Sequence, residues 1–412
     1  MKRIYLILLA VLGMGMTSCL MEEKDLFDKS PAERMDAYLS EYKDILASSE
    51  NGWLLEYYPD EDKIYGGFAY IMKFTQSEVT VYFELDDDVS TPVTSLYKVT
   101  PDDGPVITFD TYNENLHYFA TPDIVNYQAM HGDYEFRIYG KSDDGTKVFM
   151  KGKRTGNDYT LVKFSGDPVE YLDNANAVRS SITGPAYEIT MNETVYPCSI
   201  KGNIFKCQYP AGEGEEAATE SISVPFCYTS TGISFIEPVE INGVSYEGMT
   251  YNAEQVRLST SDGKISIGIA PLKVEDLVGE FTFTATSALS GSAVKGALVL
   301  ELSDDPAMGN LMFTTMFDTP CAANVYADFD TDAGTLTIAS PQLYYASASY
   351  LYGFVHLTSN GSPLQTPVVF DAGFGEFGGF NGFIGDCAFN PQNGAYLGYF
   401  EVYYNFTAKR NN

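Results

Sequence analysis

The sequence predicts a mainly β protein, built from antiparallel, meander or barrel-like (lipocalin-like) units with one amphipathic helix near the N-terminus. Aromatic residues make up 14% of the 412-residue chain, and 36 Gly accompany them, a composition that favours β-sheets. Segments with strand character alternate with short turns of Asp, Asn and Gly, which tolerate the positive φ of hairpin turns. One strongly capped helical segment precedes these strands.

The first 18 residues have the pattern of a signal peptide, and Cys19 follows them as a candidate lipidation site. Lys2 and Arg3 precede an apolar run over 4–12, which is too short to span a bilayer because a span needs about 20 residues. The residues just before the cysteine are small: Gly13, Gly15, Thr17 and Ser18. They resemble a bacterial lipobox, although Met16 replaces the usual Leu. We therefore expect acylation of Cys19; a cleaved signal followed by a chance cysteine is the alternative.

The acidic segment over 19–29 is expected to be a tether between the lipid and the folded part. Its acidic residues (Glu22, Glu23 and Asp25) resemble the export signal that sends lipoproteins of the Bacteroides group to the outer face of the outer membrane. A merely solvated linker is the alternative. Because two or more acyl chains give stable anchoring, the expected location is the outer membrane, with a lipid anchor and a surface-facing body.

The charge balance excludes nucleic acid as a partner. Lys2 and Arg3 leave with the signal peptide, so 23 basic residues remain against 56 acidic ones, a net charge of −33. Nucleic acids are bound through basic side chains that neutralise phosphates, and no basic cluster is present. No motif indicates a cofactor, so none is expected.

Three folded parts are expected after the tether: a helix plus β-meander domain over 30–168, a middle β unit over 169–270 and a C-terminal β domain over 271–412. The middle strands either form their own unit or complete the first, so the choice between two and three β domains stays open. The middle unit begins with a break over 167–185 that contains one short helix around 171–182.

The N-terminal helix has a complete start signal. Ser30 is a good N-cap, Pro31 occupies the first helical position and Glu33 closes a capping box. One face is apolar: Met35, Tyr38, Leu39, Tyr42, Ile45 and Leu46. Asn51-Gly52 is expected to end the helix. Its apolar face must lie on a sheet end or a barrel mouth.

Strand segments fill most of the remaining chain. In the first domain they are 67–74, 78–84, 93–99, 106–112, 134–139, 147–153 and 159–164. The middle strands run from 187 to 269, interrupted by a polar loop over 211–220. In the C-terminal domain the segments are 277–283, 297–302, 311–317, 324–329, 334–339, 352–357 and 396–406. Hairpins without intervening helices form a meander, and about eight such strands close into a small barrel.

Five cysteines remain besides Cys19: Cys198, Cys207, Cys227, Cys321 and Cys387. No C-x-x-C pair occurs, which argues against a zinc knuckle or a redox site. Cys198 and Cys207 flank a predicted hairpin turn over 201–203, so a disulfide is one interpretation for an exported chain. Buried free thiols are the interpretation that we favour, and the pairing stays open.

Catalytic and metal-binding motifs are weak. The chain has three histidines and neither an H-E-x-x-H nor a G-x-S-x-G motif. His117 and His131 lie near Asp123 and Asp133, but ordinary surface histidines are the favoured interpretation. Asp328, Asp330 and Asp332 have the D-x-D-x-D spacing of a calcium loop. Ala occupies loop positions six and twelve, where an EF-hand needs Gly and Glu, so an acidic hairpin turn is favoured over weak calcium binding.

Aromatic clusters are the best candidates for ligand contact. Four phenylalanines lie among glycines within ten residues: Phe374, Phe377, Phe380 and Phe383. The segment is too glycine-rich for a stable strand, so we expect a loop that either covers a core or forms a binding rim. Several tyrosines are positioned either to stack on sugar rings or to form cross-strand pairs: Tyr57, Tyr58, Tyr344, Tyr345, Tyr350 and Tyr352.

Turn and strand-start motifs resemble one family of Bacteroidetes lipoproteins. After the lipobox and the capped helix come Asn51-Gly52-Trp53, Gly66-Gly67-Phe68, Val79-Thr80-Val81 and the run from Lys151 to Asn157. This order resembles the domain of unknown function 4302, from about Cys19 to the C-terminus. The resemblance implies an outer-membrane lipoprotein of a nutrient-uptake system, whose partners would be a TonB-dependent transporter and its lipoprotein receptor. It supplies no catalytic residue.

The expected function is therefore that of a surface-exposed outer-membrane lipoprotein, a non-catalytic binding accessory in the uptake of a glycan or peptide. The anchor, the acidic body, the aromatic residues and the lack of a catalytic motif support this expectation. A hydrolase acting on the same nutrient is one alternative, which a cleft with coupled carboxylates would favour. A structural or adhesive surface protein is the other, which open edge strands would favour.

Overall fold

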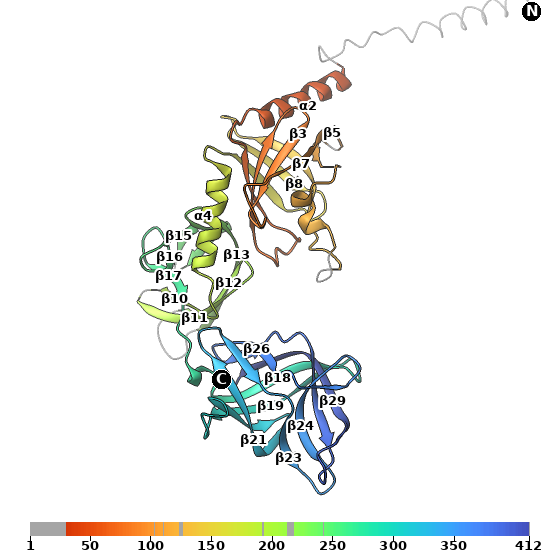
Figure 1. Ribbon diagram of the computed structural model, residues 1–412. Helices are drawn as coiled ribbons and strands as arrows, with labels where there is room; N and C mark the ends of the chain where they lie inside the picture. The colour runs from red at the N-terminus through yellow and green to blue at the C-terminus, as the bar shows by residue number, and fades with distance from the viewer. Residues whose placement is uncertain are drawn as a thin grey trace, which may run out of the picture.

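The computed structural model describes residues 30–411, apart from 103, 110, 123–126, 192, 212–217 and 242. The predicted fold class is confirmed: the chain is mainly β and antiparallel, with barrel-like units and a helix near the N-terminus. The strands form three separate sheets, and the middle one lies between the other two (Figure 1). Cys19 and the tether lie outside the described residues. Within those residues, no helix is both long and apolar enough to cross a membrane.

The N-terminal helix α2 spans Pro31–Ala47 and begins as the sequence predicts. Ser30 Oγ accepts a hydrogen bond from the Glu33 N–H at 3.2 Å, and the Glu33 carboxylate accepts one from the Ser30 N–H at 2.9 Å. The helix ends earlier than expected, with Ser48 as its C-cap. Gly52 has a φ of +92° but belongs to the turn that follows the helix, so its positive φ serves the entry into the first strand.

The apolar face of α2 covers one end of the N-terminal sheet (Figure 1). Tyr42 and Leu46 are buried in the same core as Trp53, the first residue of β1. The Trp53 indole N–H donates a hydrogen bond to the Leu46 carbonyl at 2.7 Å. This bond fixes the helix on the sheet.

The N-terminal sheet has the strand order β4-β3-β2-β1-β9-β8-β7-β6-β5. The bounds are β1 Trp53–Tyr57, β2 Phe68–Phe74, β3 Glu78–Phe83, β4 Val93–Leu96, β5 Lys98–Pro101, β6 Pro105–Thr108, β7 Glu135–Lys141, β8 Lys147–Gly152 and β9 Asp158–Lys163. The prediction of one strand over 93–99 is wrong, because β4 and β5 are separate strands at opposite edges of this sheet. Only Tyr97 separates them, and residues two apart lie within about 7 Å. The two edges therefore meet at Tyr97, and the sheet curls into a barrel-like shape.

A short helix that the sequence did not predict fills the other end of this sheet. α3 spans Glu114–His117, and the 3-10 turn η1 spans Tyr118–Ala120. Phe119 is buried in the core and stacks on Tyr57 with ring centroids 5.6 Å apart. Because Trp53 and Tyr57 are the two ends of β1, α2 and α3 lie at opposite ends of the sheet.

Helix α4, Pro168–Ser181, joins the N-terminal sheet to the middle barrel, where the sequence predicts a short helix. Asp167 caps it by accepting hydrogen bonds from two backbone N–H groups. Leu172 packs in a cluster with Ile71 of β2 and Cys227 of the barrel. Nearly two turns later, Val178 packs against the barrel core, so the helix is shared by both parts.

The middle part is a closed eight-stranded barrel, because β17 pairs back with β10. The bounds are β10 Tyr187–Met191, β11 Thr194–Lys201, β12 Ile204–Ala211, β13 Ala218–Thr229, β14 Gly232–Ile241, β15 Val244–Asn252, β16 Arg257–Ser259 and β17 Ile265–Ile269. Fully buried side chains such as Ile189, Phe226 and Leu258 fill its interior. An apolar cavity of about 10 Å³ remains among barrel residues such as Ile189 and Phe205, which is about the volume that one water molecule needs.

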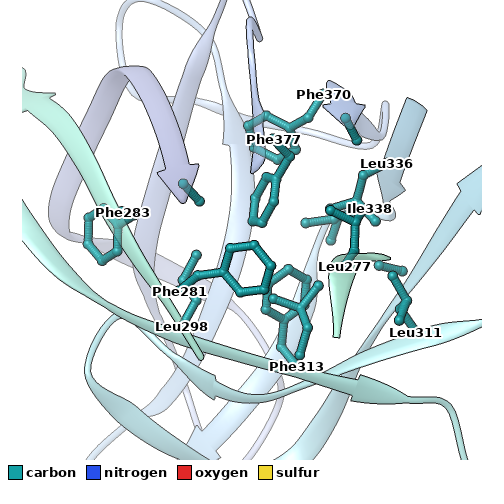
Figure 2. Close-up of a cluster of buried hydrophobic side chains, with 14 of the residues drawn as sticks. Leu277, Phe281, Phe283, Leu298, Leu311, Phe313, Leu336, Ile338, Phe370 and Phe377 are labelled. Carbon is teal, nitrogen blue, oxygen red and sulfur yellow. The ribbon is translucent and has the colours of Figure 1, made fainter. Parts of the chain in front are cut away.

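The C-terminal sheet contains a second closed ring. The bounds are β18 Gly279–Ser287, β19 Ala293–Leu302, β20 Leu311–Met316, β21 Thr319–Asp330, β22 Thr335–Ile338, β23 Gln342–Ala346, β24 Leu351–Leu357, β25 Pro363–Leu364, β26 Val368–Gly373, β27 Glu376–Gly378, β28 Phe383–Phe389 and β29 Tyr396–Arg410, preceded by the 3-10 turn η2 Val274–Leu277. Strand β29 pairs with both β27 and β18, which closes the ring. Its first half pairs with β28, which continues through β24 to β23. Phe281, Phe313 and Phe377 converge in the core (Figure 2).

The expectation of a strand-free loop around Phe374–Phe383 is wrong. Glu376–Gly378 forms the short strand β27, which pairs with β26 and β29. Gly375 and Gly379 flank this strand with φ values of +63° and +76°, so the glycines form the turns around the strand. Pairing with two neighbours stabilises a strand that its own sequence does not favour.

Candidate functional site

Four aromatic rings form a partly exposed cluster on the C-terminal sheet, which we name the aromatic shelf: Tyr345, Tyr350, Tyr352 and Phe400. Phe400 stacks on Tyr352 with ring centroids 4.7 Å apart and an interplanar angle of 17°. Tyr345 and Tyr350 contact these two rings edge-on, at 5.4 Å from Tyr352 and 5.7 Å from Phe400 respectively. Tyr345, Tyr350 and Phe400 are 38%, 40% and 41% exposed. Contacting aromatic side chains that face water form a candidate interaction surface.

Strand pairing explains how the shelf forms. Tyr345 of β23 lies opposite Tyr352 of β24, which lies opposite Ala388 of β28, which lies opposite Gly398 of β29. Directly paired residues share one face of a sheet. Tyr352 also shares this face with the buried core residue Phe354, two positions along β24. The shelf is thus the exposed continuation of the face that covers the core.

A β-bulge presents Phe400. Asp386 pairs with Glu401 and Cys387 pairs with Tyr399, so Phe400 has no partner on β28. Such an extra residue redirects a side chain, here onto the Tyr352 ring. Beside it, a Cβ built on Gly398 would meet no atom within 4 Å. The small residues at Ala388 and Gly398 therefore leave open space next to the rings.

Two carboxyl groups lie at the inner end of the shelf. Asp386 accepts a hydrogen bond from the Tyr344 hydroxyl at 2.6 Å, and burial raises the pKa of Asp386 to about 6, with a smaller contribution from the charge of Glu401. Glu401 lies directly opposite on β29 and accepts a hydrogen bond from the Ser287 hydroxyl at 2.8 Å. The site therefore combines apolar ring faces with oxygen acceptors.

The tyrosines named from the sequence separate into two groups. Tyr345, Tyr350 and Tyr352 belong to the shelf, whereas Tyr57, Tyr58 and Tyr344 are at most 3% exposed. Sequence reasoning missed Phe400, because the bulge exists only once β28 and β29 are paired. One sequence feature could have indicated the bulge. The strand pattern is interrupted at Gly398-Tyr399-Phe400, where two aromatic residues follow a glycine.

The four candidate phenylalanines take part in core packing. Phe377 is buried in the C-terminal core, against which Phe374 and Phe380 also pack. Phe383 packs against a smaller cluster that contains Val355. Ligand contact by these residues stays a prediction, and for Phe377, at 3% exposure, it would require the core to open.

The calcium candidates lie around the hairpin turn between β21 and β22. The Asp330 carboxylate accepts hydrogen bonds from the N–H groups of Asp332 and Ala333 at 3.0 and 2.9 Å, and Asp328 is exposed on β21. The described residues contain no group of three or more His, Cys, Asp or Glu that could hold a metal ion. His131 pairs with Asp60 at 2.9 Å, and Asp123 lies outside the described residues.

The five cysteines of the folded part are free thiols. Cys198 and Cys207 are directly opposite on β11 and β12, and burial raises the pKa of the Cys207 thiol to about 11. Cys227 is fully buried where α4 meets the barrel, and Cys387 is fully buried on β28. Raised thiol pKa values make poor nucleophiles at neutral pH, so these thiols do not point to cysteine catalysis.

Solved structures resemble the chain only weakly. A protein of unknown function from the DUF3598 family of Nostoc punctiforme is 9% identical, with a TM-score of 0.18, over 55% of this chain and 94% of that one. Transferrin binding protein B from Neisseria meningitidis is 12% identical, with a TM-score of 0.14, over 84% of this chain and 66% of that one. Likeness at this level carries no functional argument. No curated protein matches.

A protein-family profile matches the chain. The profile matches residues 23–253, which include the N-terminal helix and sheet, α4 and the barrel as far as the end of β15. The matched segment is more than half of the chain but stops short of the C-terminal sheet, although the resemblance was expected to reach the C-terminus. The chain belongs to the family described as "Domain of unknown function (DUF4302)".

Proposed function

We propose that this protein binds a neutral glycan on the aromatic shelf, as a non-catalytic accessory of a nutrient-uptake system on the outer membrane. The observation that carries the binding part is the set of four contacting rings, three of them exposed, on one sheet face. The lipid anchor rests on the signal sequence and Cys19. The TonB-dependent transporter and receptor partners rest on the family resemblance.

A glycan fits the shelf better than other ligand classes. A sugar ring presents an apolar C–H face and a rim of hydroxyl groups. Tyrosine offers the complementary surface, because its ring is apolar and its hydroxyl forms hydrogen bonds. The formal net charge of −31 disfavours polyanionic ligands through long-range repulsion.

The binding part is tested with residues 20–412 and a panel of neutral polysaccharides: α-glucan, β-glucan, mannan, xylan and galactan. Affinity electrophoresis should show retardation by at least one of them. Replacing two shelf rings together, Tyr350→Ala with Phe400→Ala, should weaken that binding at least about tenfold, since each aromatic contact is worth roughly 1 kcal/mol.

Leu343→Ala is the matched control. Leu343 is 41% exposed on β23 but pairs with Gly353, so it lies on the face opposite Tyr352. Its removal should leave binding unchanged. Undiminished binding by the shelf variant would contradict the proposal. If the chain bound peptides and no polysaccharide, the ligand of the shelf would be a peptide and not a glycan.

A hydrolase is the second candidate, favoured by the opposed carboxyl groups of Asp386 and Glu401. A carboxyl with a raised pKa facing a second carboxyl is the arrangement of acid–base catalysis on glycosidic bonds. Reducing-end assays on the retained polysaccharide would show product that Asp386→Asn abolishes. A ligand recovered intact after long incubation with the wild-type chain would exclude this candidate.

The location is tested separately. Metabolic labelling with an alkyne-tagged fatty acid should mark the wild-type chain and leave the Cys19→Ser variant unlabelled. Protease treatment of intact cells should degrade the wild-type chain if it faces outwards. If the chain were labelled but resistant to protease in intact cells, the lipid anchor would be supported and the surface orientation would be wrong.

A further inference from the structure

Three rings form a second exposed stack, at the α3 end of the N-terminal sheet, which we name the ring stack: Tyr112, His117 and Tyr134. The His117 imidazole lies 4.9 Å from the Tyr134 ring at an angle of 25° and 5.2 Å from the Tyr112 ring at 35°. Tyr112 and Tyr134 are 65% and 40% exposed. The stack belongs to a different sheet from the aromatic shelf, so the two are separate surfaces.

Buried amide groups hold this stack in place. Asn113 is fully buried; its side chain accepts a hydrogen bond from the Leu116 N–H at 3.2 Å and donates to Ser95 Oγ at 3.0 Å. Asn115 donates to the Asp86 carboxylate at 2.7 Å and to the Val81 carbonyl at 3.3 Å. The four-residue helix α3 is thereby attached to β3 and β4. A site supported by such hydrogen bonds is preorganised.

The composition of this surface indicates the ligand class. Among the described residues from 105 to 134, every large hydrophobic side chain that is exposed is a tyrosine: Tyr112, Tyr118, Tyr127 and Tyr134. Exposed aromatic rings that carry hydroxyl groups suit a flat, polar ligand. Acidic residues lie nearby, including Glu114 and Asp86, which disfavour an anionic ligand.

We propose that the ring stack is a second neutral-glycan site, on which Tyr112 and Tyr134 contact sugar rings and His117 fixes the spacing between them. The ligand class rests on the proposed function, whereas the site itself rests on the geometry of α3. Two sites on one chain bind a polysaccharide more tightly than either site alone whenever the ligand engages both.

The test compares three variants of residues 20–412 on the same polysaccharide panel: Tyr112→Ala with Tyr134→Ala, the shelf double variant, and all four changes together. The matched control is Tyr139→Ala, because Tyr139 is 56% exposed on β7 yet stacks on Phe149 rather than on His117. The ring-stack variant should bind at least about tenfold more weakly, the shelf variant should retain residual binding, and the combined variant should lose it. Circular dichroism verifies that each variant is folded.

The outcomes separate this inference from the proposed function. Unchanged affinity in the ring-stack variant, together with complete loss in the shelf variant, overturns the second site and keeps the first. Loss in the ring-stack variant with unchanged affinity in the shelf variant keeps the second site and overturns the first. Equal loss in the Tyr139→Ala control overturns the second site, and no binding of any polysaccharide by the wild-type chain overturns both.

Discussion

At the scale of single residues, Glu84 is a fully buried carboxyl group just after β3. Its carboxylate is 1% exposed, accepts a hydrogen bond from the Ala69 N–H at 2.9 Å and pairs with Arg179 of α4. Glu56, also largely buried, lies nearby and accepts a hydrogen bond from the Ser234 hydroxyl at 2.6 Å. Glu84 therefore lies between the positive charge of Arg179, with which it pairs, and the negative charge of Glu56. The two carboxyl groups outnumber the one guanidinium, an imbalance that protonation of one carboxyl removes.

This imbalance predicts a pH-dependent stability. Burial raises the pKa of Glu84 from 4.5 to about 7, although Arg179 opposes the rise. The other titratable groups around it are Tyr58, Tyr70, Tyr171, Tyr228 and Cys227. Because the folded chain binds this proton more tightly than the unfolded chain, the stabilising contribution is complete below pH 4.5 and is lost as the pH rises through 7.

Urea unfolding at pH 5 and pH 8 measures this effect. The wild-type chain should lose stability over this range, by at most about 1.4 kcal/mol per pH unit for one group, and Glu84→Gln should reduce the loss. Glu78→Gln, at the exposed start of β3, the strand that ends one residue before Glu84, should leave the loss as in the wild type. A Glu84→Gln chain with the wild-type decline would show that Glu84 does not titrate in this range.

Asn113 gives a second prediction at the residue scale. Asn113→Ala removes the cap of α3 and leaves the Ser95 hydroxyl and the Val93 carbonyl without their partner. We expect the free energy of unfolding to fall by about 1–3 kcal/mol, the usual cost of buried polar groups left unpaired. Asn252→Ala, which removes an exposed turn residue, should cost less in the same urea titration, and an equal cost would show that α3 is not held as described.

The residue-scale features that the sequence could predict are those that depend on near neighbours. Ser30 and Glu33 cap α2 because they are three residues apart. The surroundings of Glu84 could not be predicted, because Arg179 and Glu56 are distant from it in sequence and Arg179 reaches it only when α4 packs on the sheet. Buried charge is a property of the folded chain.

At the scale of single elements, the bulge in β29 allows the effect of a change on ligand binding to be distinguished from its effect on stability. Deleting Phe400 places Glu401 directly after Tyr399. Their partners on β28, Asp386 and Cys387, are already adjacent. Regular pairing should therefore be restored with a small change in melting temperature, while polysaccharide retardation falls at least about tenfold because the ring on Tyr352 is gone. A chain that binds normally without Phe400 would contradict the role of the bulge.

Two elements show where local pattern was insufficient. The residues over 93–99 have one continuous strand pattern, yet Tyr97 divides them between opposite edges of a curled sheet. The glycine-rich residues 376–378 have a loop-like composition, yet β26 and β29 hold them in the ring. In both cases the partner strands, which are distant in sequence, decided the conformation.

At the scale of the whole molecule, the family match and the barrel end at different residues. The match ends at residue 253, whereas β16 and β17, which close the barrel onto β10, extend to Ile269. A chain cut after 253 lacks both strands and would expose the apolar interior around Ile189 and Phe226. A chain cut after 270 keeps every strand of the first two sheets.

Expression of residues 20–253 and 20–270 tests this difference. The longer fragment should unfold in a cooperative transition and remain monomeric in size-exclusion chromatography. The shorter one should aggregate or unfold without cooperativity, because half of the pairing of β10 is missing. A stable, cooperative 20–253 fragment would show that β16 and β17 are dispensable.

The global arrangement was predictable only in part. Composition and turn residues predicted an antiparallel, barrel-like protein, and the helix around 171–182 was found at α4. The separation into three sheets could not be decided, because strand periodicity gives no information on which strands close a ring. The aromatic shelf likewise needed β23, β24 and β29 to meet across β28.

The position of β29 imposes an order on biogenesis. The first sheet and the barrel each use one continuous stretch of chain, so each can fold as soon as that stretch has been synthesised. The C-terminal ring joins β18 to a strand that reaches Arg410, and it stays open until more than a hundred further residues have emerged. During that interval the core around Phe281 and Phe283 is exposed to solvent, so this part of the chain should depend on holdase chaperones until β29 is in place.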